Sequence, residues 1–135
     1  MTLATALAPL QTSVFTALNG AASLSGRVFD KVPEPAPYPF VSLGAISELP
    51  DDSHDAQGLN STVTVHVWSK AASKAEAYAL FAAVDAALDR VALVVSGFVD
   101  VQIKHTQHQV IPDPDPDVTH INAQYRVHMT KENSE

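Results

Sequence analysis

The stretch from Asn60 to Leu88 changes its hydrophobic period partway along, and this change limits the folds open to the chain. Up to Trp68, valines alternate with polar residues, as expected of a strand that buries one face. After Ser73, apolar residues recur at every third or fourth position, which is typical of an amphipathic helix. We therefore expect a strand and the helix that follows it to form consecutive layers of an α+β protein.

This helix has both a start signal and a buried face in the sequence. Ser73 and Glu76 have the spacing of a capping box, and the helical pattern continues to about Asp89. We expect its apolar stripe to pack on the sheet. The stripe consists of Ala77, Leu80, Phe81, Val84 and Leu88.

A first helix is predicted near the start of the chain, where leucines and valines recur at helical spacing over residues 3–18. Gly20 is its expected C-terminal stop. Pro9 interrupts the pattern. Either the helix begins near Ala8, with the proline at a tolerated first position, or a longer helix kinks there. We favour the longer helix.

The remaining elements are strands, predicted at residues 27–30, 40–49, 60–68, 97–109 and 120–130. Residues 31–40 hold four prolines and are expected to be an ordered, extended connection. The order is helix, short strand, hairpin, helix, hairpin. It predicts an α+β fold with a mainly antiparallel sheet of about four to five strands and two helices packed on one face. We expect one domain over residues 1–130 and a disordered polar tail over 131–135.

Composition excludes several classes of function. The chain has 135 residues, the usual length of one domain, and a formal net charge of −7, which argues against a protein that wraps nucleic acid. It has no cysteine, which excludes disulfides and thiolate chemistry. No apolar run approaches the roughly 20 residues of a membrane span, and no basic region precedes the first apolar residues, so we expect neither a membrane segment nor a signal peptide.

Six histidines invite a metal-site interpretation. His105 and His108 lie three apart on a predicted strand, which puts them on opposite faces, so they cannot share a metal ion unless a bulge intervenes. His66, His120 and His128 could share a face across adjacent strands. No fixed-spacing motif such as HExxH accompanies them. We interpret them as polar side chains on a solvated or subunit-facing sheet surface, and we predict no metal and no cofactor.

Two acidic loops are the other candidate ion-binding features. Residues 112–117, PDPDPD, have the alternate aspartates of a calcium loop but lack its glycine and its final glutamate, and the prolines prevent the required coiling. We interpret this segment as a rigid hairpin turn. Residues 50–58, PDDSHDAQG, would need partners from elsewhere to hold a cation. No nucleophile motif and no phosphate-binding glycine loop occurs in the sequence, so no catalytic residue is predicted.

The order and spacing of several segments resemble the tail-completion, or tail-terminator, proteins of long-tailed phages and of gene-transfer particles. The resemblance covers about residues 3–130. The segments that carry it are Val28 to Asp30 followed by Val32 and Pro33, Pro39 to Leu43, Val65 to Ser69, and Tyr125-Arg126-Val127.

The resemblance implies a non-enzymatic virion protein that forms a hexameric ring, caps the tail tube and provides the surface for joining the head. Its partners would be further copies of itself, the tail-tube protein and a head–tail connector, with DNA passing through the ring without specific binding. It would assemble in the bacterial cytoplasm and reside in the particle. A ring needs two different complementary surfaces per subunit. The expected interface residues are Asp51, Asp52, His54, Asp55, Asp113, Asp115 and Asp117.

Two other classes of function remain open from the residues alone. One is a small non-catalytic α+β binding or regulatory module that works as a monomer or dimer. The other, a more distant alternative, is a metal-dependent hydrolase. A defined larger oligomer without bound metal would separate the ring from both.

Overall fold

A computed structural model describes residues 5–53 and 56–132, and in these ranges it contains two helices and five strands. The elements follow the predicted order along the chain. They are α1 (Leu7–Asn19), β1 (Val28–Phe29), β2 (Phe40–Pro50), β3 (Gly58–Lys70), α2 (Ala75–Leu88), β4 (Phe98–Ile111) and β5 (Val118–Lys131). The predicted α+β class is confirmed.

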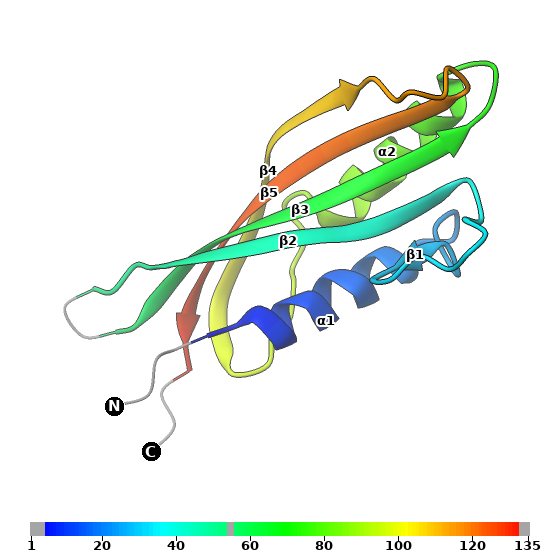
Figure 1. The fold of residues 1–135 in the computed structure, drawn as a ribbon. Helices are drawn as coiled ribbons and strands as arrows, with labels where there is room; N and C mark the ends of the chain where they lie inside the picture. The colour runs from blue at the N-terminus through cyan, green and yellow to red at the C-terminus, as the bar shows by residue number, and fades with distance from the viewer. Residues whose placement is uncertain (1–4, 54–55, 133–135) are drawn as a thin grey trace.

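The strands form one sheet in the order β1-β2-β3-β5-β4. All neighbouring strands are antiparallel except β1, which runs parallel to β2 over two residues. Strands β3 and β5 pair without interruption from Gly58↔Thr130 to Lys70↔Val118 and form the centre of the sheet. Both helices lie on one side of it, with α2 behind β3, β4 and β5 and α1 next to β2 (Figure 1).

The core lies between this side of the sheet and the two helices. Alternate residues of β3 and β5 point into it, as the alternation in the sequence predicts. The predicted stripe of α2 is buried except for Phe81, which is only partly buried. The buried side chains at its centre are Val63, Val65, Val67, Ile121, Ala123, Tyr125, Val127, Val84 and Leu88.

Helix α1 is shorter than the helix that we favoured from the sequence. It begins at Leu7, so Pro9 lies in its first turn, where the missing N–H has no intrahelical role. The longer, kinked helix was therefore wrong. The start is fixed by Glu48 of β2, whose carboxylate accepts hydrogen bonds from the Ala6 N–H (2.7 Å) and from the Thr5 hydroxyl (2.9 Å).

The predicted capping box of α2 does not form. The Ser73 hydroxyl accepts a hydrogen bond from the Ala75 N–H (3.1 Å), but Glu76 turns the other way and accepts one from the hydroxyl of Ser69 (2.7 Å). Ser69 is buried on β3, and a buried hydroxyl needs a hydrogen-bond partner because water cannot reach it. The exposed N–H groups at the helix start can bond to water instead. The helix accordingly begins at Ala75.

The end of the chain stays attached to the sheet for longer than expected. Lys131 is the last residue of β5, and its N–H donates to the Gln57 carbonyl. The Glu132 N–H donates to the Gly97 carbonyl, and the rest of the expected polar tail, residues 133–135, lies outside the described residues. No described helix is long and apolar enough to cross a membrane.

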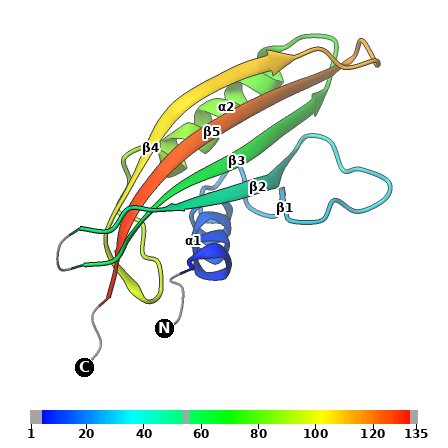
Figure 2. The same cartoon turned by 60° about the vertical axis from the view of Figure 1, so that its left-hand side comes forward.

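No described helix covers the second side of the sheet, which we call the open face (Figure 2). Polar side chains dominate it because the strands alternate. Its central members are Asn60, Thr62, Thr64, His66 and Trp68 of β3, His120, Asn122, Gln124, Arg126 and His128 of β5, and Gln102, Lys104, Gln107 and Gln109 of β4.

Candidate assembly surfaces

The tip between β2 and β3 is tied down at its base. The Asp51 N–H donates to the Gly58 carbonyl (2.8 Å), and the Asp52 carboxylate accepts from the Gly58 N–H (3.2 Å). Gly58 has no room for a side chain, because a Cβ there would collide with the Asp51 carbonyl. The Asp51 carboxylate also lies 3.0 Å from Nε2 of His128 on β5. The other two predicted residues of this tip, His54 and Asp55, lie outside the described residues.

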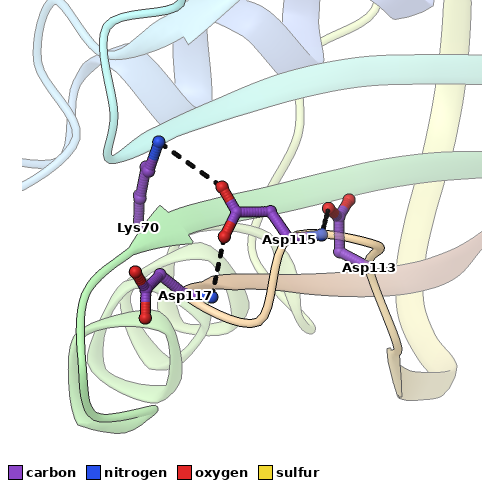
Figure 3. A network of polar contacts seen from close by, with 4 residues as sticks. All are labelled: Lys70, Asp113, Asp115 and Asp117. Atoms are coloured by element: carbon purple, nitrogen blue, oxygen red, sulfur yellow. Dashed lines mark hydrogen bonds and ion pairs between the residues drawn. The ribbon is translucent and has the colours of Figure 1, made fainter.

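The acidic turn, residues 112–117, is rigid because its own carboxylates organise its backbone (Figure 3). Asp113 accepts a hydrogen bond from the Asp115 N–H (2.9 Å), and Asp115 accepts one from the Asp117 N–H (3.0 Å). The second oxygen of Asp115 lies 3.4 Å from the Lys70 ammonium. These repeated side-chain-to-backbone bonds are those of Asx turns, so the sequence was correctly interpreted as a rigid turn.

The charges of the acidic turn are unequally compensated. The hydrogen bond from the Asp117 N–H, and then the Lys70 ammonium, lower the pKa of the exposed Asp115 carboxyl below its ordinary value. Asp117 is exposed, and within residues 5–53 and 56–132 its carboxylate has no hydrogen-bond or ionic partner. Three carboxylates therefore share a single ammonium, and the turn presents net negative charge to its surroundings.

At the same end of the open face, two histidines and the tryptophan form a stacked group. Nδ1 of His66 lies 2.8 Å from Nε2 of His120, and the His120 ring stacks on Trp68 with centroids 3.8 Å apart. Trp68 also donates its indole N–H to the Ser42 hydroxyl (3.1 Å). Burial lowers the pKa of both histidines, because the neutral rings are favoured where water is partly excluded.

His128 does not join the other two histidines of the predicted set. It shares their face, but it lies eight positions beyond His120 along β5 and pairs with Asp51 instead. Among the described residues no group of three or more potential ligands could hold a metal ion.

His105 and His108 share a face, contrary to the prediction from their separation. A β-bulge between His105 and Gln107 adds one residue to β4, so both imidazoles point to the helix side. Their facing nitrogens are 2.8 Å apart, and the ring of Phe81 on α2 packs against His108 at 4.4 Å between centroids. Alternation fails here because the bulge shifts the register by one position.

Helix α2 is joined to the sheet by a buried polar contact that the sequence did not indicate. The hydroxyl of the fully buried Tyr125 donates to Asp85 (2.8 Å). Burial, and then the Asp85 carboxylate, raise the pKa of Tyr125 far above its ordinary value. One turn later, Asp89 accepts the His105 N–H (2.8 Å). These contacts are structural and fix the position of α2 relative to β4 and β5.

The open face also contains a hollow of about 420 Å³, which we call the cationic hollow. Lys104 of β4 and Arg126 of β5 are direct cross-strand neighbours there, and Gln102, His105, Thr106 and His128 complete its lining. This pair was not among the residues predicted from the sequence. The signal was present in β5, where alternate positions from His120 to His128 are all polar or basic.

Three comparisons relate the chain to known proteins. The sequence pattern of the family described as "Tail completion protein gp17" matches residues 10–130. A protein of that description from Bacillus phage SPP1 is 37% identical over 79 residues, which are 58% of this chain and 58% of that relative. The chain therefore spans little more than half the length of this curated relative. A chain in a solved structure, "Virion of native gene transfer agent (GTA) particle", has a TM-score of 0.83 and 26% identity, and the match covers 95% of this chain and 99% of that one.

Proposed function

Because this chain belongs to the tail completion protein gp17 family, we propose that six copies close into a ring that caps the full-length tail tube and presents the surface that docks to the filled head. The chain is a structural protein of a phage-like tail. The observation that carries this function is the family match over residues 10–130, together with a fold shared almost end to end with a chain of a gene-transfer particle.

The geometry supports the finer proposal in two ways. First, the acidic turn and the β2–β3 tip lie at opposite ends of the long central strands, so one subunit can reach two neighbours. Second, several acidic side chains serve the fold: Asp85 accepts a hydrogen bond from the Tyr125 hydroxyl, Asp89 from the His105 N–H, and Glu76 from the Ser69 hydroxyl. We therefore assign the chain no catalytic role. Its partners in this proposal are its own copies, the tail-tube protein and a head–tail connector.

The direct test is the mass of the assembled protein and the fate of particles that lack it. Native mass spectrometry of the full chain should give a species of six times 14.4 kDa, and negative-stain images should show rings. Cells without the protein should accumulate filled heads that are not joined to tails. A chain that stays monomeric, together with normal particles in its absence, would favour the alternative of a small binding module.

Within this proposal the two acidic loops are contact surfaces. The residues assigned to these contacts are Asp51, Asp52, His54, Asp55, Asp113, Asp115 and Asp117. Reversing the β2–β3 tip with Asp51→Lys, Asp52→Lys and Asp55→Lys should impair the joining of heads to tails, because like charges at an interface cost several kcal/mol. The melting temperature should fall modestly, because the variant also loses the contacts of Asp52 with the Gly58 N–H and of Asp51 with His128, while the core is untouched.

A matched control changes exposed residues away from both loops: Asp30→Lys and Glu34→Lys, together with Ala22→Lys and Ser25→Lys. This variant has the same net charge as the tip variant, so it separates a local contact from a general charge effect. A full yield of infectious particles from the tip variant would remove the β2–β3 tip from the interface.

A further inference from the structure

We propose that neighbouring subunits of the ring are joined by docking the acidic turn of one copy, with Asp113, Asp115 and Asp117, into the cationic hollow of the next copy, with Lys104 and Arg126. This pairing deepens the ring proposed above and rests on it. It names the two complementary surfaces that a closed head-to-tail ring requires.

The open face is the first support, because its charge is opposite to that of the whole chain. The chain has 15 acidic and 8 basic residues. At the paired positions of β2, β3, β4 and β5 that we assign to the open face, the described residues include no aspartate and no glutamate. Lys70, Lys104 and Arg126 all occupy such positions. An acidic protein whose paired open-face positions carry bases and no acids has a surface suited to an acidic partner.

The cationic hollow is the point on this face with the greatest need for an anion. Lys104 and Arg126 lie directly opposite each other on adjacent strands, an arrangement that destabilises a sheet when the two charges are alike. Within the part of the chain that the structure describes, neither forms an ion pair. The hollow is open to solvent and its lining residues are polar or charged, so a small group of carboxylates can reach it and bring a charge to each cation.

The acidic turn has the matching shape and charge. It projects from the end of the β4–β5 hairpin, and two of its three carboxylates, those of Asp113 and Asp115, are held in place by backbone N–H groups and Lys70 (Figure 3). A rigid turn loses little conformational entropy on docking. Lys70 is itself an open-face residue, so Asp115 already shows within one subunit that this turn pairs with a cation of that face.

The turn cannot reach the hollow of its own subunit. The extended chain from Val118 to Arg126 spans roughly 26 Å at about 3.3 Å per residue, and the turn lies beyond the far end of it. The pairing must therefore join two copies. Each copy offers one turn and one hollow, which is the condition for a head-to-tail contact that repeats around a ring.

Duplex DNA is a less suitable occupant of the hollow. The Asp51 carboxylate lies at its rim, beside His128, and the chain as a whole is strongly acidic. Both features repel a polyanion, and two cations release few counterions from a phosphate backbone. The acidic turn brings three carboxylates near Asp51, whereas a DNA backbone brings a continuous run of phosphates, so the turn meets less repulsion there.

The test is a charge exchange in the full chain, with the concentration for half-assembly measured by light scattering and native mass spectrometry. The hollow variant is Lys104→Glu with Arg126→Glu. The turn variant is Asp113→Asn, Asp115→Asn and Asp117→Lys. It keeps the Asx bonds because the side-chain oxygen of asparagine accepts the same N–H groups.

Each variant alone should raise the half-assembly concentration at least tenfold, and the combination of both should return it to within about threefold of the wild type. Raised salt should weaken the wild-type ring. The matched control for the hollow variant is Lys31→Glu with Lys131→Glu. It changes the net charge by the same amount at exposed sites outside both surfaces and should assemble normally. Circular dichroism and urea unfolding of each variant verify that the fold persists.

The two proposals fail in different ways. A wild-type chain that forms no ring, in solution or on tails, refutes the ring and this pairing together. The pairing alone is refuted if the wild-type chain forms a ring and the hollow variant and the turn variant assemble as well as it does. It is also refuted if the combined variant does not restore the half-assembly concentration. A hollow variant that assembles normally but loses binding of a short DNA duplex assigns the hollow to DNA and also overturns the pairing.

Discussion

Removal of the Tyr125 hydroxyl, by Tyr125→Phe, is expected to destabilise the fold by about 1.5–2 kcal/mol. The ring of Tyr125 is fully buried and stays in place in the variant, so no cavity forms. What is lost is the 2.8 Å hydrogen bond to the Asp85 carboxylate. Hydrogen bonds to charged groups contribute roughly 1.5–3 kcal/mol. Asp85 is only partly buried, so water can replace the lost donor, and the lower half of this range applies.

The assay is urea unfolding followed by the fluorescence of Trp68, the only tryptophan of the chain. With a urea slope of roughly 1–3 kcal/mol per molar, the midpoint should fall by about 1 M. Tyr78→Phe is the matched control, because Tyr78 is 49% exposed and its hydroxyl has no partner among the residues that the structure describes. An unchanged midpoint for Tyr125→Phe would refute the idea that this contact holds α2 on the sheet.

The same tyrosine gives this test a second readout at alkaline pH. Burial and the Asp85 carboxylate raise the pKa of Tyr125, so the unfolded chain loses this proton first. The contribution to stability is complete below the unfolded pKa of about 10 and is lost as the pH rises above it. In Tyr125→Phe this component of the alkaline loss should be missing.

Three further substitutions test the packing by the same urea assay. Leu88→Ala, at a fully buried position of α2, should cost about 2–5 kcal/mol, and a cost under 1 kcal/mol would contradict the assigned core face. Gly44→Ala should cost roughly 1–3 kcal/mol, because its Cβ would lie 2.8 Å from Nε2 of His66, and a neutral result would show that the ring moves aside freely. Ser61→Ala should be neutral or stabilising by up to about 1 kcal/mol, because the buried Ser61 hydroxyl has no hydrogen-bond partner among the described residues; a clear loss would reveal one.

Local patterns in the sequence predicted the elements, because each pattern reflects the burial of one side of a strand or helix. The alternation around Val65 and the stripe ending at Leu88 identified β3 and α2 to within about two residues. The hairpins also followed from the acidic loops between strands. The pairing of β3 with β5, and the parallel pairing of β1 with β2, depend on contacts between distant segments and have no local signal.

Two of the mistaken predictions, on the two helix starts, have a common cause, which is that a distant residue took over a local role; the third comes from a bulge in β4. Glu48 of β2 accepts hydrogen bonds from Thr5 and Ala6, so α1 begins at Leu7 without a side-chain cap of its own. The hydroxyl of buried Ser69 donates a hydrogen bond to the Glu76 carboxylate, which is therefore not available for the capping box. The bulge after His105 reverses the faces of all later β4 residues relative to simple alternation, which brings His108 beside it. The cationic hollow likewise exists only through the cross-strand register.

The final prediction concerns acid pH and the pair formed by His66 and His120. Burial lowers the pKa of both below the ordinary value of 6.5; for His120 the charge of His66 lowers it further and that of Asp113 opposes the shift. The unfolded chain therefore binds more protons than the folded chain as the pH falls below about 6.5, and stability must fall with it. The urea midpoint should decrease between pH 7.5 and pH 5, above the range in which carboxylates titrate.

The two variants His66→Gln and His120→Gln should each make this decrease shallower, because each removes one of the depressed groups. His128→Gln is the control, since His128 lies at the other end of the face beside Asp51. Because the His120 ring stacks on Trp68 at 3.8 Å, the fluorescence of the folded protein should change in the same pH range as protonation disturbs the stack. A wild-type midpoint that is flat from pH 7.5 to pH 5 would mean that the pair is solvated and contributes nothing to the pH dependence of the fold. A decrease that persists unchanged in both variants would assign it to another group.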